Sequence, residues 1–352
     1  MSRSALYLPV FEAGFRLDWQ NCGYKIVFGG MYMNNRIREF ALVFGMLWSV
    51  GVLAAILVSP GQADIAETKY ETTVTSAGSE GDIVVLVAGE KQQMSFSEYL
   101  TGVLLCEIPA DFHPEAKKAQ AIVARTYAAR VAEIGIKHGP GVVCGDPGCC
   151  QGYISPEEYL GKWGVDAPIA SARDAVEETE GVVVTYKGKL VDATYFSCSG
   201  GQTEDALAVW GSDVPYLRSV ESPGEEDAEH YWYTVKYTPQ KFCEVLGIAL
   251  SGKPASWFGG ISYTKGGGVA QMFIGGKAYT GTHLRSALGL RSTWFSVKAN
   301  ENEIEITTRG FGHRVGMSQY GADAMAVGGS TCDEILHHYY YGVEIGRLSE
   351  LE

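Results

Sequence analysis

Residues 138–153, HGPGVVCGDPGCCQGY, place one histidine and three cysteines within thirteen positions. Imidazole nitrogen and thiolate sulfur are ligands that zinc binds well. Closely spaced cysteines in an oxidising compartment form disulfides instead. The residues alone therefore leave three interpretations open, namely metal ligands, disulfide partners and residues without a chemical role. The choice depends on which side of a membrane the segment occupies.

A second candidate is the acid in LLCEIPADF, residues 104–112, where Glu107 is flanked by two leucines, an isoleucine and a proline. An apolar environment disfavours the ionised carboxylate, raises its pKa and makes the group a proton donor. The alternative is an ordinary glutamate at a helix end that is solvated or ion-paired.

A third stretch, YFSCSGGQTEDALAVWG, spans residues 195–211 and has Ser197 and Ser199 on either side of Cys198. A Ser-Gly-Gly turn after a strand can present hydroxyl and N–H groups to a polar ligand, or it can be only a tight loop. Cys198 would act as a nucleophile only with a histidine base, which the sequence does not place.

The stretch 307–326, TTRGFGHRVGMSQYGADAMA, is rich in glycine but fits no nucleotide or hydrolase motif. Its glycine spacing differs from the dinucleotide-binding G-x-G-x-x-G. Tyr320 stands where a nucleophile elbow requires glycine. His313, between glycines, is either a loop histidine with satisfied hydrogen bonds or a site residue.

Composition limits the classes of partner. The chain of 352 residues is 46% apolar and 20% charged, with a formal net charge of −13. Such a charge argues against nucleic acid as a partner, because those binders concentrate lysine and arginine. A weakly charged polymer such as a glycan remains compatible with it.

Residues 40–58, FALVFGMLWSVGVLAAILV, carry no charge and predict a transmembrane anchor. As a helix they would span roughly 28 Å, close to the thickness of a bilayer core. Arginines precede the segment and acids follow it, so we expect residues 1–39 in the cytoplasm and all residues after 58 outside. A retained single-pass anchor is favoured, and cleavage after the small residues 61–63 is the alternative.

The rest of the chain predicts an α+β domain in two lobes with a mixed, mainly antiparallel sheet. After a linker over 59–80, we expect the domain to cover 81–346. The patterns favour a strand at 82–89, a helix over 95–108, an alanine-rich helix over 114–136, a helix over 168–181, a hairpin at Lys187-Gly188 and a strand-rich inserted subdomain over 222–308.

Three stretches together resemble the stage II sporulation protein D (SpoIID/LytB) family, in order from about residue 82 to 345. They are YLTGVLLCEIPADFHPEAKKAQAIVARTYAAR, SCSGGQTEDALAVWGSDVPYLRSV, and RGFGHRVGMSQYGADAMA followed by ILHHYYYGVEI. The resemblance implies a lytic transglycosylase that cleaves MurNAc–GlcNAc bonds of peptide-stripped peptidoglycan and leaves 1,6-anhydro-MurNAc ends. It implies a role in engulfment during endospore formation, with the amidase SpoIIP and the membrane protein SpoIIM as partners, in the space between mother cell and forespore.

The same resemblance assigns the catalytic glutamate to Glu107. Hydrolytic glycosidases use two carboxylates, but here the 6-hydroxyl of the sugar is the nucleophile, so one acid can serve as both proton donor and base. The matched motifs also suggest a substrate groove formed by Arg125, Tyr127, Gln151, Ser197, Ser199, Glu204, His313, Gln319 and Tyr320.

Two other function classes stay open. Related LytB proteins are described as amidase enhancers, so the chain could activate a partner amidase without catalysis of its own. The chain could also be an ordinary hydrolase that releases reducing ends.

For the first segment, the resemblance favours a structural zinc ion. Some family members have a site of two histidines and two cysteines. Here Cys149 stands in place of a histidine, so His138, Cys144, Cys149 and Cys150 would form a Cys3His site. A disulfide from Cys144 to Cys149 or Cys150 is the alternative.

Overall fold

The computed structural model describes residues 81–135, 137–229 and 231–351. All described residues belong to one compact unit. The expected cytoplasmic segment 1–39, membrane anchor 40–58 and linker 59–80 lie outside the described residues. Within the described ranges no helix combines the length and the apolar character that crossing a bilayer requires.

Two helices form the framework of the site. Helix α2 (Phe96–Glu107) begins at Ser95, whose hydroxyl accepts a hydrogen bond from the Glu98 N–H. Helix α3 (Pro114–Ile134) begins with proline at its first turn and ends at Gly135, which has a left-handed conformation. Both predicted helices are confirmed, as is the hairpin turn at Lys187-Gly188.

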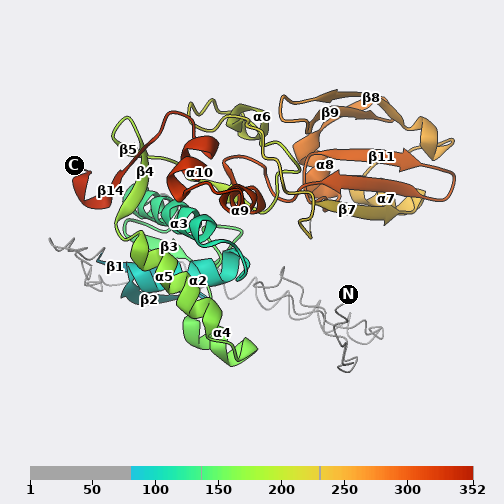
Figure 1. The fold of residues 1–352 in the computed structure, drawn as a ribbon. Coiled ribbons are helices and arrows are strands. Elements are labelled where there is room, and N and C mark those ends of the chain that lie inside the picture. Colours follow the sequence, from blue (N-terminus) through green and yellow to red (C-terminus); the bar gives the residue numbers. More distant parts are fainter. Residues whose placement is uncertain (1–80, 136, 230, 352) are drawn as a thin grey trace, which may run out of the picture. The chain divides into compact units, whose positions relative to one another are not determined.

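Helix α3 is the centre of the helical part because its many alanines are buried and let neighbouring elements approach closely. In Figure 1 it lies between α9 and α10 on one side and α2 and α5 on the other. The other helices of this part are α4 (Pro156–Trp163), α5 (Ala167–Glu178), α6 (Ala206–Trp210), α9 (Gln319–Val327), α10 (Cys332–Tyr339) and the short 3-10 helix η2 (Leu348–Glu350).

Three small sheets accompany these helices. The first has the order β2-β1-β3, the second β14-β4-β5, and the third is the pair β13-β6. Their strands are β1 (Asp82–Val87), β2 (Glu90–Ser95), β3 (Val142–Cys144), β4 (Val182–Tyr186), β5 (Lys189–Leu190), β6 (Tyr195–Phe196), β13 (Met317–Ser318) and β14 (Glu344–Arg347). The pairs β1–β3 and β6–β13 are parallel, and the other pairs of these named strands in the described ranges are antiparallel.

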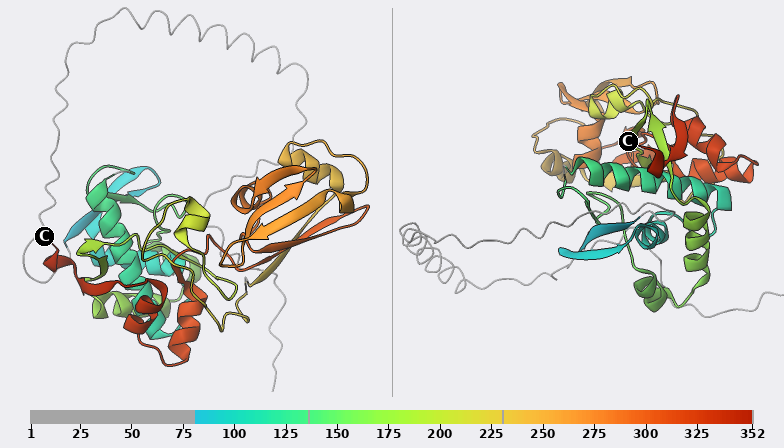
Figure 2. Two further views of the ribbon diagram at one scale, coloured as in Figure 1. Left: turned by 90° about the horizontal axis from the view of Figure 1, so that it is seen from above. Right: turned by 90° about the vertical axis from the view of Figure 1, so that its left-hand side faces the viewer.

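Residues 232–309, which we call the β-lobe, form two antiparallel sheets of three strands, with the orders β10-β9-β8 and β11-β12-β7. A separate cluster of buried apolar side chains, including Phe242, Met272 and Ile306, fills their interior. Figure 2 shows these strands gathered together, in orange. The elements are β7 (Trp232–Tyr237), α7 (Pro239–Leu246), η1 (Pro254–Ser256), β8 (Phe258–Tyr263), β9 (Val269–Ile274), β10 (Lys277–Thr280), α8 (Gly281–Ala287), β11 (Phe295–Ala299) and β12 (Ile304–Arg309).

The described part is thus a mixed α+β structure with mainly antiparallel sheets, as the sequence predicts.

Candidate active site and metal-ligand cluster

Glu107 is the last residue of α2, and two segments distant in sequence hold it. Its Oε1 accepts a 2.6 Å hydrogen bond from the Gly152 N–H. Its main-chain carbonyl accepts a 2.9 Å hydrogen bond from the Gln319 side-chain amide. The residue is half-buried. The carboxyl group is therefore fixed in orientation and only partly shielded from solvent.

Gly152 is required here for space. A β-carbon at this position would lie 2.7 Å from the Cys106 sulfur and 3.0 Å from Glu107 Oε1, closer than side chains normally approach. Any larger residue would push the loop away from the carboxylate. The sequence analysis did not identify Gly152, because nothing in the sequence distinguishes it from the other glycines of 138–153.

Gln151, immediately before this glycine, organises a buried polar network beside Glu107. Its amide donates to the Tyr99 hydroxyl at 3.2 Å and to the Ala124 carbonyl at 3.3 Å, and it accepts from the Tyr195 hydroxyl at 3.1 Å. Burial, reinforced by the negative charge of Glu107, raises the pKa of Tyr195 well above its usual value. Tyr195 therefore remains a neutral donor close to the carboxylate.

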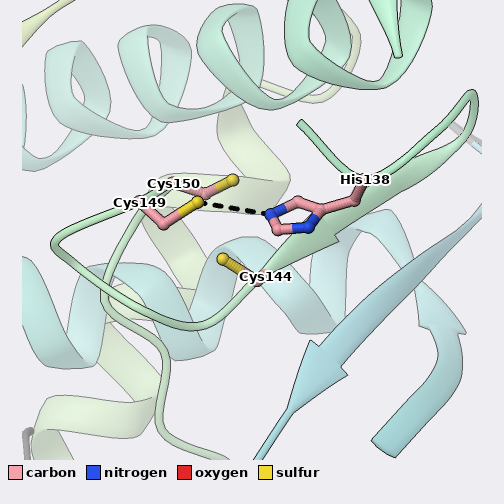
Figure 3. A group of neighbouring side chains, drawn as sticks. All are labelled: His138, Cys144, Cys149 and Cys150. Atoms are coloured by element: carbon pink, nitrogen blue, oxygen red, sulfur yellow. Dashed lines mark hydrogen bonds between the residues drawn. The ribbon is translucent and has the colours of Figure 1, made fainter. Parts of the chain in front are cut away.

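The four residues His138, Cys144, Cys149 and Cys150 converge on one point (Figure 3). Their ligand atoms all lie within 4.8 Å of one another, and the Cys149 sulfur lies 3.3 Å from Nε2 of His138. Ligands around a tetrahedral zinc would stand roughly 3.4–3.8 Å apart, given Zn–S and Zn–N bonds of about 2.3 and 2.0 Å. The arrangement can therefore hold a metal ion after a small contraction.

The chemistry of the cluster also suits a cation. The seven cysteines of the described ranges form no disulfide. Burial, together with the neighbouring Cys144, raises the pKa of the Cys150 thiol to about 12. Several thiolates cannot share such a site without a positive charge, and a divalent metal supplies that charge.

Tyr127 and Lys137 anchor the loop that carries these ligands. The Lys137 ammonium donates to the Cys149 carbonyl and, at 2.8 Å, to the Tyr127 hydroxyl. The Tyr127 hydroxyl in turn lies 3.5 Å from the same carbonyl. Tyr127 thus contacts the metal-ligand loop, whereas the matched motifs suggested it as a residue of the substrate groove.

The glycine-rich C-terminal motif meets the serine–glycine motif beside Glu107. The Tyr320 N–H donates to the Ser197 carbonyl at 3.0 Å. The half-buried Tyr320 ring packs edge-on against Phe112, with 5.0 Å between ring centres. Ser197, Gln319 and Tyr320 are therefore brought together with the glutamate, as the motifs suggested.

Three other predicted groove residues have a different role, because their side chains are 0% exposed. Arg125 donates to the Val176 carbonyl at 3.1 Å. Ser199 donates to Glu225 at 2.9 Å. Glu204 forms a 3.2 Å ion pair with Arg314. We therefore assign Arg125, Ser199 and Glu204 to the scaffold, in correction of the expectation that they contact substrate.

The Ser-Gly-Gly turn already binds an internal anion. Glu225 Oε2 accepts from the N–H groups of Ser199 and Gly200 at 2.8 and 2.9 Å, and from the Cys198 thiol at 3.2 Å. Cys198 is fully buried, and burial together with Glu225 raises its pKa far above the usual value. Nucleophilic chemistry at Cys198 is therefore excluded. Neither Glu225 nor Arg314 stands in a recognisable catalytic pattern, so neither could be singled out from the sequence.

His313 is half-buried between aromatic rings, 5.5 Å from Phe196 and 5.3 Å from Trp210. Its Nδ1 accepts from the Val315 N–H at 3.2 Å. Burial, assisted by the nearby positive charge of Arg285, lowers its pKa to about 4. At neutral pH the imidazole is therefore uncharged, which suits a hydrogen-bonding role better than an ionic one.

Comparison with known proteins points to one family. The family model SpoIID, described as stage II sporulation protein, matches residues 88–186. Stage II sporulation protein D of Bacillus subtilis (strain 168) is 37% identical over 333 residues, covering 88% of this chain and 96% of the relative. The protein of the same name from Bacillus amyloliquefaciens is 40% identical over 261 residues, covering 73% and 75%.

A more distant relative carries another name. The amidase enhancer of Bacillus subtilis (strain 168) is 28% identical over 304 residues, covering 70% of this chain and 40% of that protein. The near full-length match to the first relative decides the assignment, and the chain belongs to the stage II sporulation protein D family.

Proposed function

We propose that the chain is a lytic transglycosylase that cleaves MurNAc–GlcNAc bonds of peptide-stripped peptidoglycan, leaves 1,6-anhydro-MurNAc ends and acts in engulfment during endospore formation. The observation that carries this proposal is the setting of Glu107, a half-buried residue whose carboxyl accepts from the Gly152 N–H and whose main-chain carbonyl accepts from the Gln319 amide. Glu204, the acid suggested for the substrate groove, is engaged by Arg314 and inaccessible. A single oriented carboxyl is sufficient when the nucleophile is a hydroxyl group of the substrate itself.

In the proposed reaction Glu107 first protonates the glycosidic oxygen as the bond to the anomeric carbon breaks. The 6-hydroxyl of the same MurNAc then attacks the anomeric carbon, and Glu107 takes the proton from that hydroxyl. Because Oε1 accepts from a backbone N–H, which can only donate, the transferable proton resides on Oε2. Gly152 thus determines which oxygen faces the scissile bond.

We propose a groove beside this carboxyl whose surface is formed by Ser197, His313 and Tyr320, with Tyr127, Gln151 and Gln319 supporting it from behind. Of these, Gln151 is 2% exposed and acts through Tyr99 and Tyr195. Tyr320 is half-buried beside Phe112 and is the strongest candidate for direct contact with a sugar ring.

We also propose that the metal of the histidine–cysteine cluster is zinc in a structural role. His138, Cys144, Cys149 and Cys150 would be its four ligands, which leaves no open position for a water nucleophile. When bound, zinc would compensate the thiolate charges and cross-link the loop. The loop itself then presents Gln151 and Gly152 to the catalytic region.

For the cellular setting we propose a single membrane anchor at 40–58, with the domain outside the cytoplasm. We propose SpoIIP as the amidase partner that supplies peptide-stripped strands, and SpoIIM as the membrane partner. The uncharged apolar segment and the family membership support these assignments.

A second function, activation of a partner amidase without catalysis, is favoured by the relative named amidase enhancer. Mass spectrometry of peptide-free glycan after incubation with the protein separates the possibilities. Anhydro-MurNAc ends support the proposed reaction, unchanged strands support the enhancer, and reducing ends support a hydrolase.

A further inference from the structure

We propose that the solvent-facing side of the β11-β12-β7 sheet is a second binding site for the glycan strand, with Trp232 as its stacking surface. The ligand class rests on the proposed function; the site does not, because it lies on the β-lobe and uses none of the residues assigned to cleavage. This surface, called the outer face, comprises Trp232, Thr234, Lys236, Ser296, Lys298, Glu305, Thr307 and Arg309.

The two sides of this sheet differ in character. Alternate residues of β12, Ile304, Ile306 and Thr308, are buried and face the β-lobe interior, whereas those between them are partly exposed. An antiparallel sheet with one solvated side normally has polar residues on that side. Trp232 departs from this pattern, since it lies on the solvated side and is 61% exposed. Its indole contributes little to the core.

An arginine is held rigidly beside this indole. Arg309 pairs with Trp232 across the strands, and its guanidinium lies 4.4 Å from the Trp294 ring centre and 5.7 Å from that of Trp232. Its Nε donates to the Tyr231 hydroxyl at 2.9 Å. Stacking and this hydrogen bond fix the guanidinium before any ligand arrives, which reduces the entropy lost on binding.

The chemistry of this pair matches an N-acetylated, acidic sugar polymer. An exposed indole offers a flat apolar surface to the C–H face of a pyranose ring. A guanidinium donates hydrogen bonds to carboxylates, such as the lactyl group of MurNAc, and to amide carbonyls.

The serine–glycine segment connects the catalytic region to the outer face. This segment begins at Tyr195, which is bonded to Gln151, and reaches Gly201 six residues later. A β-carbon at Gly201 would lie 2.9 Å from the Arg309 guanidinium, so Arg309 packs directly on that glycine. Six extended residues span at most about 20 Å. One glycan strand of several sugars can therefore contact both places.

The competing explanation is that Trp232 and Arg309 only stabilise an edge strand through cross-strand packing. Binding and stability measured on the same variants separate the two. Trp232→Ala is made in the full chain carrying Glu107→Gln, so that peptide-free glycan strands remain intact during titration. Tyr263→Ala is the matched control, because Tyr263 is an aromatic residue of similar exposure, 58%, on the other sheet of the β-lobe.

We expect Trp232→Ala to weaken glycan binding roughly tenfold, a typical loss for a tryptophan at the centre of an interface. We expect Trp232→Phe to recover part of the loss and Tyr263→Ala to bind like its parent. Equal affinity of Trp232→Ala and parent overturns the proposal, even if the melting temperature falls. An equal loss for Tyr263→Ala also overturns it. If wild-type protein produces anhydro ends while Trp232→Ala binds glycan normally, only the outer-face site is refuted. If the Glu107→Gln parent binds no glycan strand, the outer-face site and the proposed function are both refuted.

Discussion

Gly152 donates its backbone N–H to Glu107 Oε1 at 2.6 Å, and Gly152 follows the last residue of the metal-ligand cluster, Cys150, by two positions. The candidate catalytic carboxyl and the candidate metal centre are thus joined through one short stretch of backbone. We therefore expect a substitution in the cluster to alter the position of the carboxyl, and a shift of the carboxyl to alter the loop of the cluster.

Replacement of Gly152 by alanine tests this junction. The added methyl group would lie 3.0 Å from Glu107 Oε1 and 2.7 Å from the Cys106 sulfur, so the loop must shift and the hydrogen bond lengthen. We expect at least a tenfold loss of glycan cleavage with retained folding. Gly161→Ala is the control, since a methyl group there meets no atom within 4 Å, and it should cleave normally. Comparable activity of the two variants would contradict the role of Gly152.

Glu107→Gln retains the shape of the side chain and removes the exchangeable proton. The oxygen of glutamine can still accept from the Gly152 N–H, so we expect glycan affinity close to wild type. Release of anhydro-MurNAc ends should fall by roughly 10² or more, the scale associated with loss of general acid–base assistance. Wild-type release rates in this variant would remove Glu107 from the mechanism.

Glu204→Gln should act on stability instead. Glu204 is fully buried and accepts from Arg314 at 3.2 Å, from the Thr264 hydroxyl at 2.6 Å and from the Gly268 N–H at 3.0 Å. Loss of its charge leaves the Arg314 guanidinium buried without its counterion, at a cost of about 3 kcal/mol in the free energy of unfolding. Chemical denaturation measures this loss. A Glu204→Gln protein that is stable yet inactive would favour a hydrolase with two carboxylates.

The metal centre is tested by composition and stability together. Protein purified without added zinc should contain about one equivalent of zinc per chain. Cys150→Ser should lose that metal and lower both melting temperature and activity, because its loop also positions Gly152. Cys243→Ser, in helix α7 of the β-lobe, should keep the metal. Absence of metal in wild-type protein, with Cys144 found in a disulfide, would refute the zinc assignment.

His313 makes a specific contribution to acid sensitivity. Burial lowers its pKa to about 4 in the folded protein, compared with 6.5 for an unperturbed histidine. Between these values the unfolded chain binds more protons than the folded one, so the free energy of unfolding falls as pH drops from 6.5 to 4. The contribution amounts to at most about 3 kcal/mol. His313→Gln should show a smaller decrease in melting temperature over this range; identical pH profiles would contradict the assignment.

The helices and the ligand cluster follow from local sequence, whereas the details of the site do not. Helix α3 could be predicted because its alanines, its first proline and the terminal Gly135 all favour the same structure. The proximity of His138, Cys144, Cys149 and Cys150 could be predicted because they fall within a short segment. In contrast, the Glu204–Arg314 pair joins residues 110 positions apart. Burial created by tertiary packing made Arg125, Ser199 and Glu204 scaffold residues, and motif matching cannot distinguish that role from substrate contact.

The contact between Gln319 and the Glu107 carbonyl joins residues 212 positions apart. The parallel strands β6 and β13 also pair across a long stretch of sequence, since the whole β-lobe lies between them in the chain. This has a consequence for the order of assembly during synthesis. A ribosome releases α2 and the metal-ligand loop long before Gln319 exists, and closing so long a loop is slow. The chain therefore has an incomplete candidate site until Gln319 has been synthesised. A product truncated before Gln319 would consequently lack the proposed cleavage activity.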